Sequence, residues 1–236
     1  MIVILAIDAL EYDLVEKWDM KELKQLKYGK TNLSDYSEPR TMVLWSSILS
    51  GKNKEEEILK IGDKEMWNFK LKTEETFFSM FNKYLAIDVP GFTQDIKYHE
   101  LEREQLKKFF NKEIDVDEFD KPLFEHHKQN KEQFLKALNG DYEIVMGYFG
   151  LIDVVGHISF GLETKMKILY KEMEEIAKIA EEKADILLIL SDHGMEAIGR
   201  FGDHSDHGFW SLNINKELGF IKPVEIYKLI KEFKEK

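Results

Sequence analysis

The sequence predicts an α/β protein, a three-layer sandwich with a mostly parallel central sheet and helices on both faces. Apolar runs that suit strands buried on both faces alternate with segments of helical periodicity. Several of these runs end at an aspartate or a histidine, which is typical of active sites at the carboxyl edge of a parallel sheet. No repeat or low-complexity linker interrupts the 236 residues, so we expect a single domain spanning 1–236.

The N-terminal part of the chain predicts a strand followed by two helices. Residues 2–7 are an unbroken aliphatic run, and residues 12–27 place apolar side chains, among them Leu26, at helical spacing. After a loop, residues 42–49 are predicted to be helical, and Gly51 is a suitable position for that helix to end.

The middle of the chain predicts one strand and a helical region. Residues 84–91 indicate a strand that ends in a Pro-Gly turn. Residues 95–138 contain no glycine, so we expect helices there and assign 92–140 to a helical cap or outer-layer insertion. Three histidines of this region lack a preceding strand and are expected on a solvated or partner-facing helix surface, which makes them poor ligand candidates: His99, His126 and His127.

The C-terminal part predicts two more central strands, at 142–149 and 185–190, separated by a helix near 163–182. The segment GFWSLNI indicates a further strand, and a helix is expected after Pro223. This alternation of strands and helices favours a parallel sheet.

Composition excludes several classes of protein. With 43% hydrophobic residues the chain can bury a large core, but it contains no apolar run of the roughly 20 residues that span a bilayer. Met1 leads directly into a core strand, so we expect a cytoplasmic protein that does not bind membranes. A formal charge of −11 argues against extended nucleic-acid binding. Because cysteine is absent, a metal must be held by carboxylates, imidazoles or hydroxyls, and zinc, manganese and magnesium are all compatible.

Metal-binding residue types follow the predicted strands at distant places in the chain. Asp8 follows the first strand, and Asp153 and His157 lie four residues apart after the strand at 142–149. In a helical turn this spacing places both side chains on one face, where they can hold one ion. Taken alone, the pair is better explained by a capping aspartate and a surface histidine.

Asp192 and His193 make the pattern more specific. They follow the strand at 185–190, and a sharp turn at Gly194 would let both side chains reach one metal, with Ser191 at the same edge. Burying an acid and an imidazole at the end of so apolar a strand is unfavourable without a cation. The segment therefore predicts a metal centre.

Thr41 is the candidate nucleophile. It precedes the predicted helix, so its hydroxyl would lie at a helix N-terminus, where free N–H groups and the helix dipole favour a phosphate. A threonine alcohol must be deprotonated to react, which metal coordination achieves without a histidine base. Taken alone, Thr41 would be interpreted as an N-cap residue. Ser46, Ser47 and Ser50 are interpreted as helix-surface or packing residues.

These motifs, in this order, resemble the alkaline phosphatase superfamily and, within it, the type I phosphodiesterase and nucleotide pyrophosphatase group. The resemblance rests on Asp8, TMVLWSSILSG at 41–51, DVVGH at 153–157, SDHGM at 191–195 and a late Gly-x-His. It extends to about residue 213, but 52–140 matches little apart from IDVPG.

The resemblance implies an alkaline phosphatase-like fold and a centre of two divalent metal ions, usually zinc, about 4 Å apart. Thr41 would attack phosphorus, form a phosphothreonine and be released by water. The substrate would be a small phosphate ester or a nucleotide. The ligands carried over by position are Asp8, Thr41, Asp192 and His193 for one ion, and Asp153, His157 and a late histidine for the other.

The late histidine is either His204 or His207. His204 lies four residues before Gly208, which is similar to the spacing in relatives, and we favour it on this ground. His207 directly precedes Gly208, a pattern found in other members. Asp203 and Asp206 of the same polar loop are interpreted as turn residues.

One departure from the family concerns substrate recognition. The nucleotide pyrophosphatases commonly carry an asparagine three residues after the nucleophile, where it holds a phosphate oxygen, whereas this chain has Leu44. Trp45 or Lys52 could face the pocket instead. The capping region is also short, so a bulky nucleotide pocket is either absent or built from the helices of 95–138.

Three functions are compatible with these features. The first is a metal-dependent phosphoric ester hydrolase of the phosphodiesterase or pyrophosphatase type. The second is phosphomonoester or sulfate ester hydrolysis, or phosphate transfer, on the same metals, although the absence of cysteine counts against a sulfatase. The third is a metal-binding scaffold without turnover, against which the retention of every expected ligand argues. The sequence does not indicate an oligomeric state.

Overall fold

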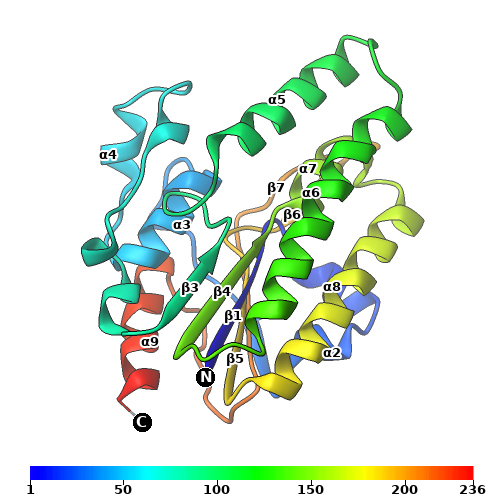
Figure 1. Cartoon of the computed structure of the whole chain (residues 1–236). Coiled ribbons are helices and arrows are strands. Elements are labelled where there is room, and N and C mark those ends of the chain that lie inside the picture. The colour runs from blue at the N-terminus through cyan, green and yellow to red at the C-terminus, as the bar shows by residue number, and fades with distance from the viewer. Residues whose placement is uncertain (236) are drawn as a thin grey trace.

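The structure of the chain, a computed structural model that describes residues 1–235, is built around a six-stranded sheet (Figure 1). Four neighbouring strands are parallel, β8 runs antiparallel to β5, and β2 runs antiparallel to β8. In spatial order the strands are β2 (Lys27–Lys30), β8 (Phe209–Leu212), β5 (Ile186–Leu190), β1 (Ile2–Ile7), β4 (Ile144–Phe149) and β3 (Tyr84–Ile87). A separate antiparallel ribbon consists of β6 (Met195–Ile198) and β7 (Phe201–His204).

Helices cover both faces of this sheet, which confirms the predicted three-layer α/β class. The α-helices are α1 (Tyr12–Lys17), α2 (Lys21–Lys24), α3 (Thr41–Ser50), α4 (Glu55–Leu59), α5 (Ile96–Phe110), α6 (Val116–Ala137), α7 (Leu151–Ser159), α8 (Glu163–Lys183) and α9 (Ile226–Lys234). Short 3₁₀ helices are η1 (Met66–Asn68), η2 (Thr73–Glu75), η3 (Phe77–Met80) and η4 (Pro223–Glu225).

The side chains of β1 alternate between the two faces and so contribute to two separate cores. Val3, Leu5 and Ile7 belong to the core beneath α6, α7 and α8, whereas Ile4 and Ala6 belong to the core beneath α3 and α9. Because both faces are covered, all residues of β1 are buried, as its aliphatic composition predicts. Each fully buried Leu or Ile of this kind stabilises the fold by about 1.5–3 kcal/mol.

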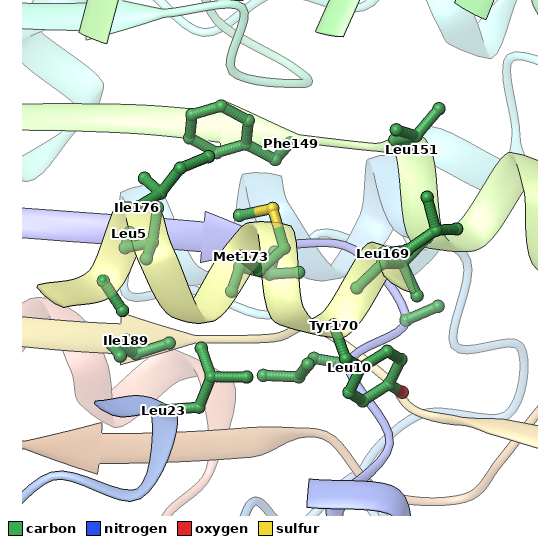
Figure 2. Close-up of a cluster of buried hydrophobic side chains, with 14 of the residues drawn as sticks. Leu5, Leu10, Leu23, Phe149, Leu151, Leu169, Tyr170, Met173, Ile176 and Ile189 are labelled. Atoms are coloured by element: carbon green, nitrogen blue, oxygen red, sulfur yellow. The ribbon is translucent and has the colours of Figure 1, made fainter. Parts of the chain in front are cut away.

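Helix α8 supplies much of the first core through one apolar face. Its helical period brings Leu169, Met173 and Ile176 onto the side that faces the sheet. Figure 2 shows these side chains gathered with Leu5 of β1 and Phe149 of β4. This packing fixes the strand ends from which the site residues project.

One predicted element is wrong. Instead of a single helix over 12–27, the chain forms α1 and α2 and then enters β2. Asp19 adopts a left-handed conformation with φ of 50°, which interrupts the helix. Leu26, which contributed to the apparent helical period, is 60% exposed. Pairing of β2 with β8 has overridden the local pattern.

The predicted helical region at 92–140 consists of α5 and α6. They are separated by a turn in which Lys112 has φ of 61°. Helix α6 packs on β3, β4 and α8, whereas α5 lies beyond the carboxyl ends of the parallel strands (Figure 1). None of the helices in residues 1–235 has both the length and the apolarity that crossing a bilayer requires.

Candidate metal centre

The carboxyl ends of β1, β4 and β5 meet at one edge of the sheet. Asp8 directly follows β1, and Asp192 lies in the segment after β5. Asp153 lies in the first turn of α7, the helix that follows β4 in the chain. A cleft of about 420 Å³ opens over this edge, and Asp8, Thr41, Asp153 and His204 contribute to its walls. Segments far apart in the chain thus converge at this edge.

His193 is the buried centre of a first group. Its Nδ1 donates to the carbonyl of Gly194 at 3.0 Å, so its Nε2 carries a lone pair. This Nε2 lies 3.3 Å from Asp8 Oδ1 and 3.4 Å from Asp192 Oδ2, and it accepts a 3.3 Å hydrogen bond from the Thr41 hydroxyl. Two carboxylates that face an imidazole lone pair repel one another unless a cation lies between them.

Asp153, His157 and His204 form a second group. His157 Nε2 lies 3.4 Å from Asp153 Oδ2, and His204 Nε2 lies 3.4 Å from Asp153 Oδ1. The His157 ring is oriented by its Nδ1, which donates to the carbonyl of Gly202 at 3.3 Å. The rings of His193 and His204 stack with centroids 3.7 Å apart, so the two groups are adjacent.

The residues present fit a site for divalent metal ions. Buried side-chain atoms that lack a hydrogen-bond partner within residues 1–235 include Asp8 Oδ1, both carboxylate oxygens of Asp192, Asp153 Oδ1 and His204 Nε2. Such unpaired atoms are rare, and each costs about 1–3 kcal/mol. In each of two sets, Asp8 with Asp192 and His193, and Asp153 with His193 and His204, the ligand atoms lie within 4.8 Å of one another. Carboxylate oxygens and imidazole nitrogens are suitable ligands for zinc and manganese.

The electrostatics of the site also favour a cation. Burial, together with the charge of Asp153, raises the pKa of Asp8 to about 7, and burial raises the pKa of Asp192 as well. Burial lowers the pKa of His193 to about 3, whereas the neighbouring Asp153 raises the pKa of His157 to about 9. Buried carboxylates that repel one another resist ionisation, and burial keeps the His193 imidazole neutral, which is the form that binds a metal.

The two candidate late histidines lie in different surroundings. His204 faces Asp153, whereas His207 lies outside both groups. His207 Nε2 is 3.1 Å from Glu11 and His207 Nδ1 is 3.0 Å from Asp206, so both of its nitrogens donate to carboxylates. The structure therefore brings His204 to the centre and places His207 in a different cluster.

Thr41 is the first residue of α3, not its N-cap. The N-cap is Arg40, whose side chain makes no capping bond to the first turn. Leu44 and Trp45 are fully buried, and the suggestion that Trp45 could face the cleft is wrong. Lys52, the other suggested residue, is likewise not among the described residues that line the cleft.

The three histidines of α5 and α6 are not on a solvated surface, contrary to the prediction. His99 stacks on Trp67 with ring centroids 3.5 Å apart, and His126 stacks on Tyr98 at 3.6 Å. His127 is only 8% exposed. Neighbouring segments cover these helices, and the pattern within a helix cannot reveal that contact.

Two residues that contact the site segments had not been predicted. The Tyr148 hydroxyl donates to Asp8 Oδ2, and burial keeps the pKa of Tyr148 well above its ordinary value, so the hydroxyl remains a donor. Glu11 is buried three residues after Asp8 and accepts several hydrogen bonds. Tyr148 lies next to β1 in the sheet, opposite Ala6, a register that periodicity alone cannot supply.

No protein-family profile and no curated protein matches the sequence. A magnesium-bound mutant of TAB5 alkaline phosphatase is similar over 99% of this chain and 97% of its own length, with a TM-score of 0.52 and 12% identity. The chain has the fold of an alkaline phosphatase. The fold implied by the sequence motifs is thereby confirmed.

Two further solved structures are similar to this chain at lower TM-scores. Murine ectonucleotide pyrophosphatase/phosphodiesterase 5 matches 84% of this chain with a TM-score of 0.45 and 11% identity. Ps i-CgsB, in complex with k-i-k-neocarrahexaose, matches 96% of this chain and 70% of its own length, with a TM-score of 0.48 and 11% identity. The chain spans 58% of the length of the murine protein.

Proposed function

We propose that this chain is a two-metal hydrolase of phosphate esters, of the phosphodiester or nucleotide pyrophosphate type, with Thr41 as nucleophile. The observation that carries the proposal is the contact of the Thr41 hydroxyl with His193 Nε2, the same atom that faces Asp8 and Asp192. A threonine in contact with a buried, unpaired ligand set is suited to nucleophilic catalysis.

The metal assignment follows the two groups. Asp8, Thr41, Asp192 and His193 would hold one divalent ion, and Asp153, His157 and His204 would hold the other, with zinc as the expected metal and manganese or magnesium as alternatives. When bound, the ions would supply positive charge that favours the threonine alkoxide and the charge developing on phosphorus.

The protein's own groups would carry the remaining steps. Thr41 Oγ1 would form a bond to phosphorus as the ester oxygen departs, and water would then hydrolyse the phosphothreonine. Thr41 begins the ten-residue helix α3 and so lies at the positive end of a helix dipole, where the Arg40 side chain makes no capping bond. The first-turn amides are therefore available to a phosphate oxygen.

Other polar groups of the cleft would replace the asparagine that Leu44 does not provide. Gln94 lines the cleft, is 9% exposed, and its side-chain amide makes no hydrogen bond within the described residues. We propose that this amide binds a phosphate oxygen. The helical insertion would act as a cap, since Glu102 and Arg103 of α5 also line the cleft.

A second candidate is hydrolysis of phosphate monoesters on the same site. It is favoured by Arg40, which lies next to Thr41 in the cleft wall and could bind the additional charge of a monoester. Its guanidinium is already engaged by Glu38 at 2.7 Å and by Asp63, however, and this favours the diester.

The test compares hydrolysis of bis(p-nitrophenyl) phosphate and p-nitrophenyl phosphate by wild type and Thr41→Ala, with zinc or manganese added. We expect faster turnover of the diester and loss of turnover in Thr41→Ala. Equal rates for the two proteins would exclude Thr41 as nucleophile. If zinc binds but neither substrate is hydrolysed, the result would favour a metal-binding scaffold.

A further inference from the structure

Glu11 is a buried carboxylate that accepts hydrogen bonds from several segments. Oε1 accepts from the Asp13 amide at 2.9 Å and from His207 Nε2 at 3.1 Å. Oε2 accepts from the Met195 amide and the Ser205 hydroxyl, each at 3.0 Å. With 5% exposure and a full set of donors, this carboxylate is a fixed point of the fold.

The segments that donate to Glu11 are those that carry candidate ligands. Met195 lies two residues after His193, and Ser205 directly follows His204. Glu11 itself lies three residues after Asp8, and its own amide donates to the Tyr170 hydroxyl of α8 at 2.8 Å. The carboxylate of Glu11 thus joins the segments that follow β1, β5 and β7, and its backbone amide ties them to a packed helix.

The packing around Glu11 is close. A Cβ atom at Gly194 would lie 2.3 Å from Glu11 Oε2 and 2.6 Å from Ser205 Oγ, so a larger side chain at 194 would displace the carboxylate. The two loops are also bonded directly to each other, since the Gly194 amide donates to the His207 carbonyl at 2.6 Å and the Ser205 amide to the Gly194 carbonyl at 3.1 Å.

We infer that Glu11 is a positioning residue that holds His193 and His204 in place relative to Asp8, with His207 as its cationic partner. This inference rests on the proposed metal centre. Candidate ligands on turns and on a short ribbon are precise only if their surroundings fix them. In other metalloproteins, residues that hold the metal ligands without touching the metal contribute about 10–100-fold to metal affinity.

The charge of the cluster is balanced for this role. His207 faces Glu11 on one side and Asp206 on the other, so an imidazolium between two carboxylates directs both N–H groups into hydrogen bonds. Besides His207, the cluster has a second cation, Lys30, whose charge interacts with His207. Glu11 and His207 therefore hold the segment 203–207 by hydrogen bonds between charged groups, and neutral residues would make these bonds more weakly.

The experiment measures zinc affinity of wild type, Glu11→Gln and Asp120→Asn by competition with a chromophoric chelator, together with thermal unfolding of the metal-free proteins. Asp120→Asn is the matched control, because Asp120 is a partly buried carboxylate that pairs with Lys165 at 2.6 Å and, within residues 1–235, with none of the candidate ligands. We expect Glu11→Gln to bind zinc about 10–100-fold more weakly and Asp120→Asn to bind it as wild type does.

A folded Glu11→Gln variant with unchanged zinc affinity would overturn the inference, as would an equal loss in Asp120→Asn. Should Glu11→Gln fail to fold, Ser205→Ala removes a single bond to Glu11, and we expect a several-fold loss of zinc affinity with a retained fold. Unchanged affinity in Ser205→Ala would then overturn the inference. Absence of zinc binding by wild type would instead overturn the proposed function itself.

Discussion

The Thr41 hydroxyl donates a hydrogen bond of 3.3 Å to Nε2 of His193, although the residues lie 152 positions apart in the chain. This contact is possible because α3 begins at Thr41 and β5 ends just before His193 at the same edge of the sheet. The candidate nucleophile therefore lies in contact with the ligand group.

Replacement of Thr41 should remove catalysis while the carboxylate and imidazole ligands of both ions remain. Thr41→Ala deletes the attacking oxygen but leaves the carboxylates and imidazoles, so we expect kcat to fall by at least about 10³-fold with little change in the melting temperature. Thr41→Ser keeps a hydroxyl and should recover part of the activity. The measurement is steady-state hydrolysis beside metal content, and full activity of Thr41→Ala would refute the assignment.

The two late histidines should differ in metal content. His204→Ala removes a nitrogen that faces Asp153, and we expect the purified protein to lose one ion. His207→Ala removes a partner of Glu11 and should retain both ions at reduced affinity. Elemental analysis after equilibration with zinc distinguishes the two, and unchanged metal content in His204→Ala would reject His204 as a ligand.

Metal binding should release protons at neutral pH. Asp153 raises the pKa of His157 to about 9, so this imidazole is protonated at neutral pH in the metal-free protein and must lose its proton to bind a metal. Zinc affinity should therefore rise with pH up to about 9. Calorimetry in buffers of different ionisation enthalpy would measure the release, and a heat that is independent of the buffer would contradict it.

The free energy of unfolding of the metal-free protein should fall as the pH rises from 6.5 to about 9. Because the folded pKa of His157 exceeds its ordinary value of 6.5, the folded state binds the proton more tightly than the unfolded state. The stabilisation is complete below pH 6.5 and is lost as the pH rises through about 9. Thermal unfolding should show a falling melting temperature between these limits, and His157→Gln should weaken the trend.

Gly208 should be needed for the geometry of the Asp192 segment. A Cβ atom at this position would lie 2.3 Å from the Ser191 carbonyl oxygen and 2.6 Å from that of Asp192, so backbone must move. We expect Gly208→Ala to lower both stability and zinc affinity. Gly219→Ala is the control, since Gly219 has φ of 61° but a Cβ atom there would meet no atom of the described residues within 4 Å, so only its stability should fall, by about 1–2 kcal/mol. Normal zinc binding by Gly208→Ala would count against this account.

Gln94 should matter for substrate binding more than for stability. Its free amide lines the cleft, so Gln94→Leu should raise KM for the diester by about 10-fold or more, the effect of losing a hydrogen bond to a charged group. Gln129 on α6 bonds only the neighbouring Glu125 in the described part of the chain, and Gln129→Leu is the control. Equal KM values for Gln94→Leu and wild type would remove Gln94 from the substrate site.

The arrangement of the site was largely predictable from local sequence. An aliphatic strand such as β1 has one stable place in an α/β protein, and a polar residue that follows it must emerge at the sheet edge. The four-residue spacing of Asp153 and His157 likewise determines a shared helix face. These are short-range consequences of chain geometry, and they predict that residues such as Asp8, Asp153 and His157 lie at one edge of the sheet.

Contacts between segments decided the rest. The sequence determined the fold class and the edge at which Asp8, Asp192 and His193 gather, because burial and periodicity act within each segment. Only the tertiary structure separated His204 from His207, broke the helix expected at 12–27 and buried Glu11, since each of these depends on which distant segment packs alongside. The free energy of such contacts exceeds local preference, and a single sequence does not encode it as a pattern.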